Sequence, residues 1–159
     1  MDLRFAPLRT ARLRIEPLTT ESARAILAGD LSGWRVAEGW PHEDTADGLG
    51  LAVNSSHPPG WLITANGAVI GECGTHGPVD KAGGVEIGYG LAAPHRGQGY
   101  GSEAVPAITE WLLGQAEVRQ VRARTLIGNT ASRRVLEKAS FQLVGCSDEE
   151  AFYRRGPAG

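Results

Sequence analysis

Short apolar runs, separated by glycine and polar residues, set out the order of elements along this chain. Over residues 13–16 leucine and isoleucine alternate with charged residues, which predicts a strand with one buried face, ended by Pro17. Asn66 and Gly67 separate two further apolar runs in the manner of a tight β-hairpin. The remaining strands are predicted over residues 61–65, 68–73, 85–92, 121–127, 141–145 and 151–154, with the last at an edge of the sheet.

Helical patterns lie between these strands. A threonine at position 19 or 20 can cap a helix that runs to Leu27, and Thr45 can cap another short helix. Two longer helices are predicted, one after the glycines near position 100 and one over residues 130–139. The apolar face of the first consists of Ala104, Val105, Ile108, Trp111 and Leu112. This order of elements predicts an α/β protein whose mixed sheet has helices on both faces.

Composition and charge restrict the classes of partner. The chain has 159 residues and a net charge of −2, so we expect a single domain over residues 1–159, with no general attraction to nucleic acid or to anionic membranes. No apolar run approaches the length of a membrane span and no apolar leader follows Met1, so we expect a cytoplasmic protein. The histidines and cysteines show no metal-ligand spacing, and no metal is predicted.

The segment from Leu91 to Gly101 carries the clearest chemical signal. An apolar strand runs into glycines at positions 97, 99 and 101, and a helix follows. Backbone N–H groups at such a junction lie at the positive end of a helix dipole and can cradle a phosphate or pyrophosphate. Glycine allows close approach of the anion and the positive φ angles that such a turn requires. A tight turn without a ligand is the alternative.

The spacing of these glycines indicates which anion is bound. A dinucleotide-binding loop reads G-x-G-x-x-G, and here the third glycine comes one residue too early. A Walker A loop ends in lysine followed by serine or threonine, and this loop has no lysine. The pattern Arg96-x-x-Gly99-x-Gly101 instead resembles the pyrophosphate loop of the GCN5-related N-acetyltransferases, the GNAT family.

Three other segments strengthen this resemblance. In their residues and in their order around the glycine loop, these segments resemble the branch that includes the RimJ/RimL-like ribosomal-protein N-terminal acetyltransferases. They are residues 8–18, 86–89 and 129–141. The resemblance implies the GNAT fold, with a mostly antiparallel sheet splayed at a bulge. It also implies acetyl transfer from acetyl-CoA to a primary amine, either a protein N-terminus or a small molecule, by a monomer or homodimer.

By this resemblance, the cofactor is held at three places. The loop backbone would bind the pyrophosphate, and the strand before it would pair with the pantetheine arm. Asn129 would bond the pantetheine, or cap the following helix, or do both. Arg96 would add charge to the phosphates or be solvated. The predicted cofactor-binding residues are Tyr89, Gly90, Leu91, Arg96, Gly97, Gln98, Gly99, Tyr100, Gly101, Ser102 and Asn129.

The same resemblance suggests how the amine is activated. Glu86 is the predicted general base, acting through a water, with an outward-facing carboxylate or a structural ion pair as the alternative. His76, near a strand end, is a second candidate. A backbone N–H near Leu91, freed by the bulge, would stabilise the oxyanion.

Protonation of the leaving thiolate is where the chain departs from the family. Many members place a tyrosine at the position of Leu136 and a glutamate at that of Arg124. Ser132 occupies a position where the RimL-like branch has a serine near the sulfur, so it is the predicted thiol partner, with helix capping as the alternative. Ser140 stands where the family has a glycine, and we expect a strained turn there.

The acceptor and the non-catalytic alternative stay open at this point. Candidate liners of the acceptor site are Trp34, Trp40, His42, Trp61 and Tyr153, all of which are equally suited to the core. Because the expected acid and base are incomplete, a non-catalytic acyl-CoA sensor is the second interpretation.

Overall fold

The computed structural model describes residues 3–45 and 60–157. Within them, eight strands form one sheet in the order β1-β2-β3-β4-β5-β6-β8-β7. The strands are β1 (Leu8–Arg9), β2 (Leu13–Leu18), β3 (Gly60–Ala65), β4 (Ala68–His76), β5 (Gly84–Leu91), β6 (Gln120–Leu126), β7 (Gln142–Cys146) and β8 (Glu150–Arg155). The helices are α1 (Thr20–Leu27), α3 (Tyr100–Leu113) and α4 (Thr130–Lys138), with a 3₁₀ turn, η1, at Ala93–His95.

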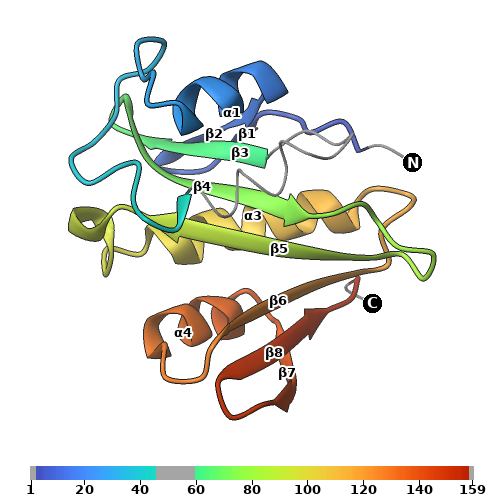
Figure 1. Ribbon diagram of the computed structural model, residues 1–159. Helices are drawn as coiled ribbons and strands as arrows, with labels where there is room; N and C mark the ends of the chain where they lie inside the picture. Colours follow the sequence, from blue (N-terminus) through green and yellow to red (C-terminus); the bar gives the residue numbers. More distant parts are fainter. Residues whose placement is uncertain (1–2, 46–59, 158–159) are drawn as a thin grey trace.

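The sheet is mixed and mostly antiparallel, which confirms the predicted fold class. β5 and β6 are the parallel pair, and the other neighbours run antiparallel. Helices α3 and α4 cover one face, and α1 packs on the other (Figure 1). The hairpin between β3 and β4 turns through Asn66 and Gly67, both with the positive φ that its sequence predicts.

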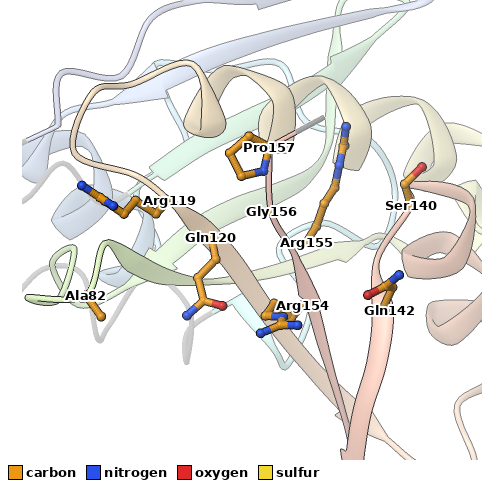
Figure 2. A pocket seen from close by; sticks show the side chains of 9 residues that line it. All are labelled: Ala82, Arg119, Gln120, Ser140, Gln142, Arg154, Arg155, Gly156 and Pro157. Atoms are coloured by element: carbon orange, nitrogen blue, oxygen red, sulfur yellow. The ribbon is translucent and has the colours of Figure 1, made fainter. Parts of the chain in front are cut away.

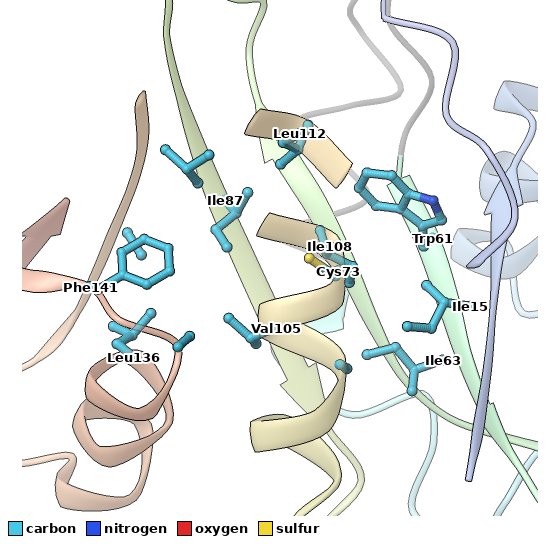
Figure 3. Close-up of a cluster of buried hydrophobic side chains, with 14 of the residues drawn as sticks. Ile15, Trp61, Ile63, Cys73, Ile87, Val105, Ile108, Leu112, Leu136 and Phe141 are labelled. Atoms are coloured by element: carbon cyan, nitrogen blue, oxygen red, sulfur yellow. The ribbon is translucent and has the colours of Figure 1, made fainter. Parts of the chain in front are cut away.

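The main core lies between the sheet and the pair α3 and α4 (Figure 3). Alternate strand residues such as Ile63 and Ile87 meet Val105 and Ile108 of α3. Trp61, 0% exposed, stacks on Phe5 with a ring-centroid distance of 3.9 Å. Tyr153 is 2% exposed in the same core. Trp61 and Tyr153 are therefore core residues, and our suggestion that they line the acceptor site is wrong.

Four local predictions need correction or comment. β2 continues through Pro17, which pairs with Trp61, so proline does not end the strand. β8 lies between β6 and β7 and is not an edge strand. Ser140 has a φ of 69°, the left-handed conformation expected where the family has glycine. The helix predicted after Thr45 lies in residues 46–59, outside the described residues.

Candidate functional site

The central feature of the candidate site is an opening between β5 and β6. Their pairing ends at Ile87 and Ala123, although β5 continues to Leu91 and β6 to Leu126. On its other side β5 remains paired with β4 in unbroken register up to the Gly71–Leu91 pair. The strands thus open without the bulge that we expected at this point in β5.

Backbone groups of β5 face into this opening. The amide of Ala92 donates to the carbonyl of Ile70 at 2.7 Å, which fixes the alternation of hydrogen bonds along the β4–β5 ladder. By that alternation Gly88 and Gly90 bond to β4, whereas the N–H groups of Tyr89 and Leu91 point toward the opening. An extended ligand can pair there with β5 as an added strand, and a donor for an oxyanion is present without a bulge.

The glycine loop lies at the end of this same strand. Gly97 and Gly99 have φ angles of 74° and 83°, and Gly99 is the N-cap of α3 without a capping side chain. The N–H groups of the first helical turn therefore have no side-chain partner from the cap and suit an anion. Arg96 turns back, and its Nε donates to the carbonyl of Leu91 at 3.0 Å.

The N-terminal segment holds the loop in place. Nε of Arg12 lies 2.9 Å from Oε1 of Glu103 in the first turn of α3, and its Nη1 donates to the carbonyl of Gln98 at 3.0 Å. The Arg12 guanidinium also lies 4.4 Å from the ring centroid of Tyr100. The block of residues 8–18 thus contributes to the site by fixing the shape of the loop.

Asn129, Ser132 and Tyr89 meet on the α4 side of the opening. Asn129 caps α4 by accepting a hydrogen bond from the Ser132 amide at 3.1 Å. The hydroxyls of Ser132 and Tyr89 are 2.8 Å apart, and burial raises the pKa of Tyr89 to about 12. Leu136, at the position where many family members have a tyrosine, is part of the core. The phenol beside Ser132 comes instead from Tyr89 in β5, a contact that the sequence analysis missed.

Glu86 and His76 form a pair on the opposite face of the sheet. Nδ1 of His76 lies 3.0 Å from Oε2 of Glu86, and Nε of Arg124 lies 3.5 Å from Oε1. The hydrogen bond with His76 lowers the pKa of Glu86, and the nearby arginines act in the same direction against burial. The two base candidates are thus brought into contact.

A second carboxylate–imidazole pair was missed. Glu72 and His42 have side chains only 7% and 9% exposed, and Nε2 of His42 lies 3.0 Å from Oε1 of Glu72 without good hydrogen-bond alignment. Trp40 Nε1 and Thr45 Oγ1 donate to the same oxygen at 3.0 and 2.7 Å. The sequence signal was a lone glutamate inside the apolar run of β4.

The Glu72–His42 pair lies directly against β5. A Cβ on Gly90 would come within 2.7 Å of Cε1 of His42 and 2.5 Å of Oε2 of Glu72. The glutamate raises the pKa of His42 above its usual value, although burial acts in the opposite direction. Of the suggested acceptor-site liners, His42 therefore does lie against β5, whereas Trp40 is 4% exposed in the second core cluster and reaches this pair only through its bond to Glu72.

A cavity of about 530 Å³ lies at the far end of the sheet from the glycine loop (Figure 2). Arg119, Arg154 and Arg155 line it. None of the predicted cofactor or catalytic residues does. Arg133 in α4 donates to Tyr153 Oη at 2.9 Å and to the Ile127 carbonyl at 3.0 Å.

Two further observations concern the described part of the chain only. Residues 3–45 and 60–157 hold no cluster of three or more His, Cys, Asp or Glu side chains that could bind a metal ion. The helices in these ranges are too short or too polar to cross a membrane.

Comparison with known proteins agrees with this geometry. The chain is 28% identical over 150 residues to the uncharacterized N-acetyltransferase YjdG of Bacillus subtilis, covering 86% of this chain and 89% of YjdG. The solved structure of RimL, a ribosomal L7/L12 alpha-N-protein acetyltransferase in complex with coenzyme A, matches with a TM-score of 0.68 at 18% identity, covering 95% of this chain and 98% of that one.

AAC(6')-Ib, solved in complex with ribostamycin and coenzyme A, matches with a TM-score of 0.64 at 20% identity, covering 91% of this chain and 93% of that one. These two structural likenesses concern the fold. The family model described as an acetyltransferase (GNAT) domain matches residues 12–142, which is most of the chain. The chain therefore belongs to the GNAT acetyltransferase family.

Proposed function

We propose that this protein is a single-domain enzyme that transfers an acetyl group from acetyl-CoA to a primary amine. The observation that carries the proposal is the alignment of two anchoring surfaces along β5. The open edge of β5 presents the N–H groups of Tyr89 and Leu91, and the same strand leads into the glycine loop at the start of α3. An extended ligand with a phosphate-rich end fits this combination.

The two faces of the opening suit the two halves of the reaction. Ser132 and Tyr89 lie on the α4 face, where a hydroxyl can donate to the departing thiolate. Glu86 and His76 lie on the other face, where an amine can lose its proton. Because the acid and base side chains lie on opposite sides of the same strand, the amine and the leaving group need not compete for space. This division favours an enzyme over the acyl-CoA sensor.

Two classes of acceptor fit the relatives. RimL is a ribosomal L7/L12 alpha-N-protein acetyltransferase, and AAC(6')-Ib was solved with ribostamycin, an aminoglycoside. We propose a primary amine of one of these classes, a protein N-terminus or a small molecule. An α-amino group has a pKa near 8, so an appreciable fraction is neutral at pH 7, whereas a lysine amine near 10.4 needs more help from a base.

Calorimetric titration with acetyl-CoA, with NAD and ATP as controls, tests the cofactor assignment. Gly99→Val should weaken acetyl-CoA binding by about tenfold or more, because it distorts the loop whose N–H groups would meet a charged phosphate. Gly77→Val is the matched control, since Gly77 has a φ of 81° and open space around it, away from the loop. Equal affinity in both variants, or no binding by the wild type, would contradict the assignment.

Ser132→Ala tests the thiolate partner. We expect kcat to fall by roughly tenfold, because one hydroxyl donor is lost while Tyr89 stays in place. The affinity for acetyl-CoA should change little, since the Ser132 amide still bonds to Asn129. Steady-state kinetics with the best acceptor amine measures this, and Ser22→Ala in α1 serves as the control. An unchanged kcat would remove Ser132 from the reaction.

A further inference from the structure

We propose that His76 is the group that takes the proton from the acceptor amine, with Glu86 as the residue that positions its ring. This inference rests on the proposed acetyltransferase function and changes the assignment of the base. Glu86 was the stronger candidate from the sequence, and the structure distributes the two tasks differently between the pair.

The contact with Glu86 determines which nitrogen of His76 can act. Nδ1 lies 3.0 Å from Oε2 of Glu86, so in the neutral ring the proton belongs on Nδ1, where it can be donated to the carboxylate. Nε2 then carries a lone pair and is the free basic nitrogen. The side chain is 28% exposed, which leaves it accessible to an acceptor.

Nε2 of His76 lies at the start of the opening. A Cβ on Gly88 would come within 2.6 Å of Nε2, so the ring covers the backbone of this glycine on the face opposite α3. Gly88 is the first residue of β5 beyond the last pair with β6, and it precedes Tyr89, whose N–H faces the opening. The base is thus one residue, about 3.3 Å along the strand, from the Tyr89 N–H, and three residues, about 10 Å, from Leu91, near which the oxyanion donor was predicted.

Glu86 is poorly placed to act directly. It lies three residues before Tyr89, which corresponds to about 10 Å along the strand. Its two oxygens face His76 and Arg124, at 3.0 and 3.5 Å. Because His76 and the arginines stabilise its charged form, the carboxylate suits ring orientation better than proton removal.

Other charged groups surround His76, and any pH dependence includes them. β6 contributes Arg124 and Arg122, of which Arg122 is paired with Asp80 at 3.1 Å. Glu72 of β4 and His42 form a pair that lies over Gly90, two residues beyond Gly88 along β5. Arg124 lies near Glu86 itself and near Glu150, at 3.5 and 3.8 Å, whereas Arg122 and His42 are paired elsewhere. The His76–Glu86 pair is the one directed at Gly88.

The step balances without an additional reactant. Nε2 of His76 accepts one proton from the ammonium form of the acceptor, and the freed nitrogen lone pair forms the C–N bond at the thioester carbonyl carbon. The C–S bond breaks, and its electron pair leaves on sulfur. The second nitrogen proton is lost as the amide forms, the thiolate gains one proton, and His76 releases its proton to water.

The first test concerns the ring in the free protein and requires no turnover. Nitrogen-15 NMR of histidine-labelled protein at alkaline pH should show His76 with a protonated Nδ1 and an unprotonated Nε2. Glu86→Gln should weaken this preference, and Glu110→Gln, an exposed residue of α3, should not. A wild-type ring with the proton on Nε2 would overturn the proposal, whether or not the protein is an acetyltransferase.

The second test separates the base from its positioning residue by kinetics. His76→Ala should lower kcat/KM by about a hundredfold and abolish the acid limb of its pH profile, while acetyl-CoA binding by calorimetry persists. Added imidazole should restore part of the rate. Glu86→Gln should keep the acid limb but lower kcat, because the ring loses the carboxylate that holds its orientation.

The reverse pattern would overturn the assignment. An acid limb that survives in His76→Ala and disappears in Glu86→Gln would identify Glu86 as the base. Failure of the wild type to bind acetyl-CoA would contradict the proposed function instead, and the NMR result would still decide the state of the ring.

Discussion

Gly71→Ala is expected to destabilise the protein by about 3 kcal/mol and to abolish acetyl-CoA binding. Gly71 lies in β4 opposite Leu91, the last residue of β5 before the chain turns into the glycine loop. A Cβ there would overlap the Gly90 carbonyl oxygen and lie 2.7 Å from Cδ2 of Leu91. Backbone atoms cannot rotate out of the way, so β4 and β5 would have to separate.

The effect on binding follows from the position of this contact. The N–H groups of Tyr89 and Leu91 point into the opening because the β4–β5 ladder holds β5 in its register. Separation of the two strands at Leu91 would move both groups and the start of the loop. Thermal or urea unfolding and calorimetric titration measure the two effects.

Gly145→Ala is the matched control for this experiment. Gly145 also lies in a strand, β7, and has no atom within 4 Å of an added Cβ. We expect its stability and binding to match the wild type. A Gly71→Ala protein as stable as the control would show that the strands do not approach as closely as described.

Local signals explain why much of the fold could be predicted. The hairpin at Asn66 and Gly67 and the glycine loop depend on backbone conformations that few residues adopt, so their positions are visible in the sequence. The apolar face of α3 follows from helical periodicity, and the structure buries Ala104, Val105, Ile108 and Leu112 as expected.

Contacts between distant residues explain most of what could not be predicted. Tyr89 was identified only for its backbone, because its hydroxyl contact with Ser132 joins residues 43 positions apart. Arg12 and Glu103, which hold the glycine loop, are separated by 91 positions. β8 was placed at the edge of the sheet because strand order is not contained in the pattern of a single strand.

The Glu72 cluster is the clearest example of such a long-range feature. Trp40, His42 and Thr45 approach Glu72 from a segment with no clear period, and β4 supplies the carboxylate. From the sequence, a glutamate in an apolar run suggests only a position near the surface. Its burial becomes understandable once the two donors, Trp40 and Thr45, and the nearby imidazole are counted, because a buried carboxylate needs such partners.

Glu72→Leu is therefore expected to destabilise the protein by about 3 kcal/mol or more. Leucine fills part of the space but accepts no hydrogen bond, so the Trp40 indole N–H and the Thr45 hydroxyl lose their acceptor. Urea unfolding measures the change. Glu38→Leu, at an exposed position, is the control and should unfold like the wild type. Equal stability of the two variants would show that Glu72 is not buried among these donors.

The charge of Glu72 can be separated from its hydrogen bonds by Glu72→Gln. In the wild type the pKa of folded His42 lies above its usual 6.5, chiefly through Glu72. The stability that this contact contributes is fully present below the unfolded pKa and is lost as pH rises through the folded pKa. The wild type should therefore exceed Glu72→Gln in stability by more at pH 6 than at pH 9. A stability difference independent of pH, together with an unshifted His42 titration by NMR, would mean that the imidazole and the carboxylate do not interact as the 3.0 Å contact indicates.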